Sequence, residues 1–133
     1  PKRDMLWISA AGPLANIALA LASGILFRVL VAAGEAPDRT SIMGLFIYVV
    51  LMSLQINLAL AVFNILPIAP LDGSKILSGL LPTGFEKIFY FMERYGPFIL
   101  LGLIIVGSAT GVSILGRIIW PFVKLFSHIF AGI

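Results

Sequence analysis

Long apolar segments separated by short polar ones make up most of this chain. Residues 5–31, 42–66 and 97–116 each exceed the roughly 18 apolar residues that mark a membrane-spanning helix. Residues 114–133 are either an amphipathic interfacial helix or a short spanning one, because Arg117, Lys124 and His128 recur on one helical face. The pattern predicts a single all-α integral membrane domain over residues 1–133, a bundle of about three transmembrane helices with interfacial amphipathic helices.

The segments between these helices differ in character. Residues 34–40 form a short polar connector, so the two helices that it joins should pack as an antiparallel hairpin. Residues 67–82 contain helix-breaking prolines and are expected to form an irregular loop. In residues 85–95 the charged side chains share one helical face and the large apolar ones share the other, which is typical of a helix in the membrane interface.

The composition agrees with a membrane protein. Hydrophobic residues make up 60% of the chain and charged residues 11%, too few for the polar surface of a soluble domain. The net charge of +3 is spread along the chain, so the expected partner is the lipid bilayer and not nucleic acid. The absence of cysteine excludes disulfides and thiolate metal sites. Basic residues before the first helix and after the second predict that the amino terminus and residues 67–82 face the cytoplasm.

A single carboxylate, Asp72, ends the charge-free stretch from Ser41 to Leu71. An ionisable group at membrane depth costs a few kcal/mol, so it marks a candidate functional site. The spacing leaves three roles open for Asp72, which are capping a helix that begins near Ser74, pairing with Lys75, or binding a metal ion. Caps and ion pairs are common, whereas a rigid loop shaped by proline and glycine suits a metal ligand.

Three other polar residues have alternative interpretations. Asn64 either terminates the second helix through a hydrogen bond or orients a substrate carbonyl in a wet cleft. Asn16, one turn after a Gly-Pro pair, is expected to tie helices together. The chain has one histidine, His128, and we expect it to be an interfacial residue because a metal-binding histidine normally has further ligands beside it.

Several intramembrane chemistries can be set aside. A serine mechanism needs a general base, and no histidine lies near Ser74 in the sequence. An aspartyl mechanism needs two carboxylates on facing helices, and Asp72 has no such partner in the first or third spanning segment. A transporter often shows paired broken helices in matching halves, and only one clear break is present.

Two motifs carry a resemblance to a known family. The segment Asn64-Ile-Leu-Pro67-Ile-Ala-Pro70-Leu-Asp72-Gly73, followed by Lys75-Ile-Leu, resembles the metal-ligand motif of the site-2 protease family (peptidase family M50), the zinc intramembrane metalloproteases. The segment Ala11-Gly12-Pro13-Leu-Ala-Asn16 resembles the Gly-Pro-x-x-Asn element of the preceding core helix in that family, and the lead-in at residues 1–5 resembles its compact prokaryotic branch. The likeness covers nearly the whole chain and is specific at residues 11–16 and 64–75.

The resemblance implies a role for each matching residue. Asp72 would be the third protein ligand of a catalytic zinc ion, and Asn64 would lie near the scissile carbonyl. The resemblance further implies loop-shaping roles for Pro67, Pro70 and Gly73, and helix-packing roles for Gly12, Pro13 and Asn16. The family hydrolyses a peptide bond in or near a transmembrane segment of a substrate protein, with zinc activating a water and a glutamate as general base. A transmembrane protein substrate and a prokaryotic plasma membrane location follow from the same likeness.

The sequence departs from the family at one decisive point. The other two zinc ligands and the base belong to a His-Glu-x-x-His helix, which this chain lacks and which precedes the Gly-Pro-x-x-Asn helix in the family. We therefore expect the carboxy-terminal part of a metalloprotease, inactive alone and partnered by an upstream His-Glu-x-x-His segment, or a truncated copy. Two other classes stay open, a non-catalytic helix-binding pseudoprotease and a small transporter subunit with Asp72 as an ion site.

Overall fold

The computed structural model describes residues 2–133, and these form five helices and no strand. The helices are α1 (Lys2–Ala32), α2 (Ile42–Ile65), α3 (Asp72–Leu80), α4 (Glu86–Thr110) and α5 (Ile114–Ala131). Within the described part of the chain, α1, α2, α4 and α5 are long and apolar enough to cross a membrane. The all-α class is confirmed, and four candidate spans are roughly consistent with the predicted three.

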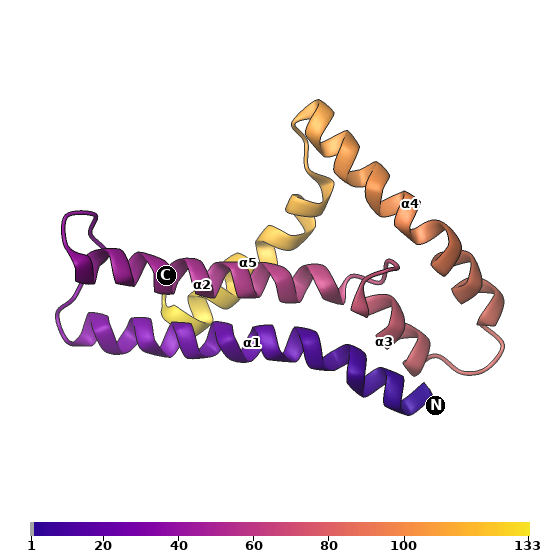
Figure 1. The fold of residues 1–133 in the computed structure, drawn as a ribbon, viewed down its shortest axis with the longest axis horizontal. Coiled ribbons are helices and arrows are strands. Elements are labelled where there is room, and N and C mark those ends of the chain that lie inside the picture. The colour runs from indigo at the N-terminus through magenta and orange to yellow at the C-terminus, as the bar shows by residue number, and fades with distance from the viewer. Residues whose placement is uncertain (1) are drawn as a thin grey trace.

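Helices α1 and α2 form an antiparallel hairpin, as the short connector predicts (Figure 1). The Ser41 side chain caps α2 by accepting a hydrogen bond from the Gly44 N–H at 3.0 Å. In the connector the hydroxyl and backbone N–H of Thr40 donate to Asp38, and these bonds hold the pKa of the Asp38 carboxyl below its ordinary value. Between the helices, apolar side chains such as Ile47 and Leu54 are completely buried. This buried core therefore fixes α1 and α2 relative to each other.

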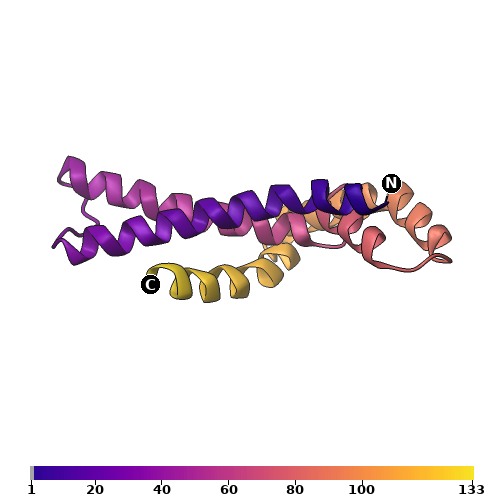
Figure 2. The same cartoon turned by 90° about the horizontal axis from the view of Figure 1, so that it is seen from below.

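Helix α5 packs along one side of the hairpin, as Figure 2 shows. Its end approaches α1 at Gly24, where an added Cβ would lie 2.6 Å from the Phe130 carbonyl oxygen. One turn further along α1, the Arg28 side chain donates hydrogen bonds to the carbonyls of Phe130 at 3.0 Å and Ile129 at 2.9 Å. A guanidinium at these last carbonyls satisfies backbone groups that a helix end leaves unpaired and complements the helix dipole.

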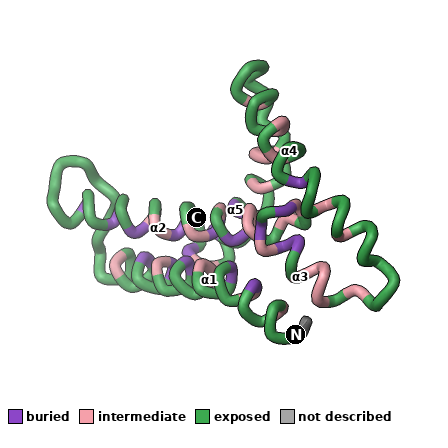
Figure 3. Tube along the Cα trace, turned by 45° about the vertical axis from the view of Figure 1, so that its right-hand side comes forward, coloured by how far each residue is buried: buried purple, intermediate pink, exposed green. Residues whose placement is uncertain are grey.

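Helix α4 is continuous, whereas the sequence analysis divided the region into an interfacial segment (85–95) and a spanning segment (97–116). Pro97 lies inside it and removes a single N–H, which does not end the helix here. The helix instead ends at Gly111, which adopts a left-handed φ of 74°, and α5 begins three residues later. Most of α4 is exposed (Figure 3), and Gly96 is its buried residue, against the backbone of Ala69.

Replacing Gly24 with alanine tests the contact between α1 and α5. The added methyl would press on the Phe130 backbone, so we expect a loss of about 1–3 kcal/mol in unfolding free energy. Thermal unfolding in detergent micelles measures it. Gly102→Ala is the matched control, because a Cβ there meets no atom within 4 Å and alanine favours a helix by up to about 1 kcal/mol. Equal melting temperatures for the two variants would contradict the packing described.

Candidate functional site

The loop that presents Asp72 is a short series of turns between α2 and α3. The Leu66 N–H donates to the Phe63 carbonyl at 3.2 Å, and the Leu71 N–H donates to the Ile68 carbonyl at 2.9 Å. The side chains of Ala69 and Leu71 are buried, and their packing holds the loop in place. The Ala69–Pro70 peptide bond is cis. Pro67 and Pro70, both exposed, lie in this irregular loop, where they were expected.

The start of α3 lies directly against the end of α2 at Gly73. A Cβ at Gly73 would lie 1.9 Å from the Ile65 carbonyl oxygen and 2.2 Å from that of Leu66. No side chain fits such a space, so glycine is required for a steric reason and not for its backbone angles. This contact between two backbones fixes the residue before it, Asp72.

The Asp72 side chain reaches across to α1. A Cβ at Gly12 would lie 3.1 Å from Asp72 Oδ2, so the carboxylate lies directly over the glycine. Pro13 is buried and Asn16 is half-buried on the same helix. The structure thus brings the Gly12–Asn16 segment and the Asp72–Gly73 segment together, although they are far apart in the sequence.

The Asp72 carboxylate has no partner among the described side chains. It is half-buried, and within residues 3–133 it makes no hydrogen bond or ion pair. The N-cap residue of α3 is Leu71, and Lys75 is exposed and unpaired with Asp72 in this part of the chain. The cap and ion-pair roles are therefore not realised here. A favourable place in the first turn of α3, at the positive end of the helix dipole, remains a structural role for Asp72.

A zinc site needs more donors than the described residues supply. No group of three His, Cys, Asp or Glu side chains lies close enough to hold a metal ion in the described part of the chain. His128 lies in the last turn of α5, near the Arg28 end of α1 and not the Gly12 end. A half-buried carboxylate without a partner fits one ligand position, but these residues alone do not fit a tetrahedral zinc site.

Asn64 lies in the last turn of α2, where its side-chain nitrogen donates to the Leu60 carbonyl at 2.9 Å. This bond corresponds to the simpler of the two roles expected for Asn64, a hydrogen bond at the helix end. The side chain is half-buried, and its carboxamide oxygen accepts no bond from the described residues. Binding of a substrate carbonyl by Asn64 stays a prediction.

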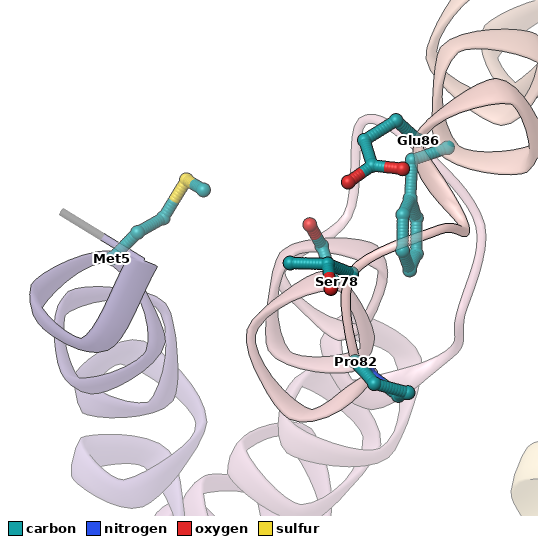
Figure 4. Close-up of a pocket in the computed structure, with 6 residues that line it drawn as sticks. Met5, Ser78, Pro82 and Glu86 are labelled. Carbon is teal, nitrogen blue, oxygen red and sulfur yellow. The ribbon is translucent and has the colours of Figure 1, made fainter.

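A recess beside this site was not anticipated from the sequence. It has a volume of about 320 Å³ and lies between the beginning of α1, the end of α3 and the beginning of α4 (Figure 4). Its lining comprises Met5, Ser78, Pro82, Thr83, Glu86 and Phe89. Met5 at the start of α1 and the stretch 78–89, which are far apart in the sequence, form it together, so no local pattern indicates it.

The sequence profile described as peptidase family M50 matches residues 29–106, more than half of the chain. The chain therefore belongs to peptidase family M50, the site-2 protease family, and with its apolar helices it is an integral membrane protein. It is 31% identical over 138 residues to a Bacillus subtilis (strain 168) protein named "Putative zinc metalloprotease YwhC". The match covers 98% of this chain and 60% of that relative, so the chain spans less than two thirds of its length. No solved structure matches the chain significantly.

Replacing Gly73 with alanine should open the loop that holds Asp72. The methyl group cannot fit beside the Ile65 carbonyl, so the backbone of α3 must move away from α2. We expect residues 66–72 to become sensitive to limited proteolysis and the protein to lose about 2 kcal/mol or more of stability. Gly102→Ala again serves as control, and unchanged protection in Gly73→Ala would contradict the contact.

Proposed function

We propose that this chain is the Asp72-bearing, carboxy-terminal part of a zinc metalloprotease that hydrolyses peptide bonds in or near transmembrane segments. Asp72 supplies one zinc ligand, and the other ligands and the general base come from a His-Glu-x-x-His segment outside residues 1–133. When bound, the zinc ion would activate a water for attack on the peptide carbonyl. The observation that carries the proposal is the contact between Asp72 and Gly12, which joins the two family motifs around a carboxylate without a partner.

The contribution of this chain to the reaction is to hold the Asp72 carboxylate still. Gly73 fixes the backbone on α2, and Gly12 leaves room for the carboxylate on α1. A metal ligand positioned by rigid elements keeps its geometry better than one on a free loop. In this proposal Asn64 orients the substrate carbonyl. Its carboxamide group lies in the last turn of α2, beside the loop that presents Asp72.

The proposed location is the prokaryotic plasma membrane, with the Asp72 loop toward the cytoplasm. The basic side chains that support this orientation are Lys2, Arg3, Lys75, Lys87 and Arg94, against Arg39 alone in the opposite connector. The proposed partners are a transmembrane protein substrate, the lipid bilayer and the upstream segment.

The second candidate is a pseudoprotease that binds transmembrane helices without cutting them. It is favoured by one observation, that the described residues hold no group of three potential metal ligands. The two candidates differ in what Asp72 does, because a helix-binding protein does not need a carboxylate free of partners.

Asp72→Ala in the native full-length protein distinguishes them. Loss of a zinc ligand should remove bound zinc and lower cleavage of a transmembrane substrate by more than about 100-fold, since even residues that only support ligands change affinity or activity by 10–100-fold. Zinc is measured by elemental analysis and cleavage by gel mobility. Asp38→Asn, in the connector at the other end of the hairpin, is the control and should retain both. Full activity in Asp72→Ala would refute the assignment.

Residues 1–133 purified alone should retain no zinc and show no peptidase activity, because a single carboxylate does not hold the ion. Equilibrium dialysis against zinc and the same cleavage assay check this. Stoichiometric zinc together with cleavage by the isolated chain would contradict the need for an upstream segment.

A further inference from the structure

Helix α4 makes a very close contact with the loop that presents Asp72. Gly96 is the buried residue of α4, and a Cβ added there would lie 2.8 Å from the Ala69 carbonyl oxygen, 2.9 Å from the Ala69 Cβ and 3.1 Å from the Ala69 nitrogen. An alanine at position 96 would therefore overlap the loop, so glycine is required there for a steric reason. The backbone of α4 lies directly against the backbone of the loop.

The contact belongs to one face of α4. Phe89, Met92 and Gly96 follow one another at spacings of three and four, so they share a helical face, and each is less exposed than the residues between them. Phe89 and Met92 also line a small recess together with Ala69 and Ser74. This face of α4 therefore covers the loop and the start of α3, whereas the rest of the helix runs away from the hairpin (Figure 1).

Ala69 belongs to the turn that immediately precedes Asp72. The Leu71 N–H donates to the Ile68 carbonyl at 2.9 Å, which closes a four-residue turn with Ala69 inside it. The Leu71 carbonyl in turn accepts hydrogen bonds from the Ser74 N–H at 3.2 Å and from the Ser74 hydroxyl at 2.9 Å. Asp72 lies between these two bonded residues. Because this backbone is closed by hydrogen bonds on both sides, a displacement of Ala69 moves Asp72 as well.

Three helices contact the segment around Asp72, each at a glycine. Gly73 lies against the last carbonyls of α2, Gly12 of α1 lies under the carboxylate, and Gly96 of α4 lies against Ala69. The first two glycines belong to the motifs at residues 11–16 and 64–75, whereas Gly96 lies outside both. The support from α4 is therefore a part of the site that the motifs do not include.

We propose that Gly96 is a positioning residue for Asp72 and acts through Ala69. Glycine at this position lets the backbone of α4 support the turn at residues 68–71, and this support keeps the carboxylate over Gly12. The catalytic consequence rests on the metalloprotease function proposed above. A ligand must be held within about 0.5 Å of its productive geometry, so a shift of the turn by that much disturbs the site.

The first test reads the position of residue 72 without any metal. Residues 1–133 contain no cysteine, and a Cβ at residue 12 lies 3.1 Å from Asp72 Oδ2, so Gly12→Cys and Asp72→Cys place two sulfurs within bonding reach. In the native full-length protein with this pair, and with serine for any cysteine outside residues 1–133, a mild oxidant should close a disulfide, followed as loss of maleimide labelling. Adding Gly96→Ala should slow closure about tenfold, because disulfide formation depends steeply on geometry. Gly102→Ala, on the same helix with no atom within 4 Å of the added Cβ, should not slow it.

Ala69→Gly completes a double-mutant cycle in the same assay. Alone it loosens the contact and should also slow closure. Combined with Gly96→Ala, it removes the Cβ that the new methyl would meet, so closure should return toward the native rate. If Gly96→Ala does not fold, Ala69→Gly alone takes its place. Closure at the native rate in the single variant, or two effects that simply add in the double variant, overturns the proposal.

The second test reads the consequence for the metal site. In the native full-length protein loaded with cobalt in place of zinc, the visible absorption of each bound ion reports on its ligand geometry. Gly96→Ala should change that absorption and lower kcat about 10- to 100-fold with KM unchanged, because it shifts a ligand and not a group that binds substrate. A merely structural role would lower the amount of folded protein but leave the absorption and kcat per bound ion at their native values, and that result overturns the proposal.

The two tests separate failure of this proposal from failure of the protease function. If the native protein binds neither cobalt nor zinc, the metalloprotease function fails, and the disulfide test alone decides whether Gly96 positions residue 72. If the native protein binds cobalt and cleaves its substrate, but Gly96→Ala closes the disulfide at the native rate, the positioning role fails and the protease function stands.

Discussion

The close contact between the end of α2 and the start of α3 at Gly73 is the constraint on which the candidate site depends. Two backbone carbonyls occupy the space that any side chain would need. The direction of α3 is therefore fixed relative to α2, and Asp72 is held at the first position of α3. Because α2 is itself fixed by the apolar core of the hairpin, this contact links the burial of Ile47 and Leu54 to the position of the carboxylate.

Other close contacts in the structure also occur at glycines. The end of α5 packs against Gly24, the Asp72 carboxylate lies against Gly12, and the loop at Ala69 packs against Gly96 of α4. In a membrane the hydrophobic effect does not drive one apolar helix onto another, so close approach and hydrogen bonding carry the association. Arg28 on the α5 carbonyls and Ser23 on Ser53 are the hydrogen-bonded counterparts of these glycine contacts.

Much of this arrangement is predictable from the sequence, for identifiable reasons. Length and apolarity indicate the helices. The motifs at residues 11–16 and 64–75 carry the family resemblance, and the second of them lies inside the M50 match over residues 29–106. The continuity of α4 was not predicted, because a proline ends a soluble helix more readily than one among apolar residues. The contact of Gly73 with α2 and the recess near Met5 depend on how distant segments pack, and local patterns hold no information on this.

The hairpin has two unlike sides, and the difference bears on its chemistry. One side is mostly apolar and is covered by α5, with an apolar cavity around residues such as Leu58 and Val62. The other side bears carboxamides and hydroxyls that lipid cannot satisfy, and the Asp72 carboxylate lies at its end. Polar groups at membrane depth are stable only beside protein or water, so this side needs a polar partner for the same reason that a lipid-facing helix needs an apolar surface.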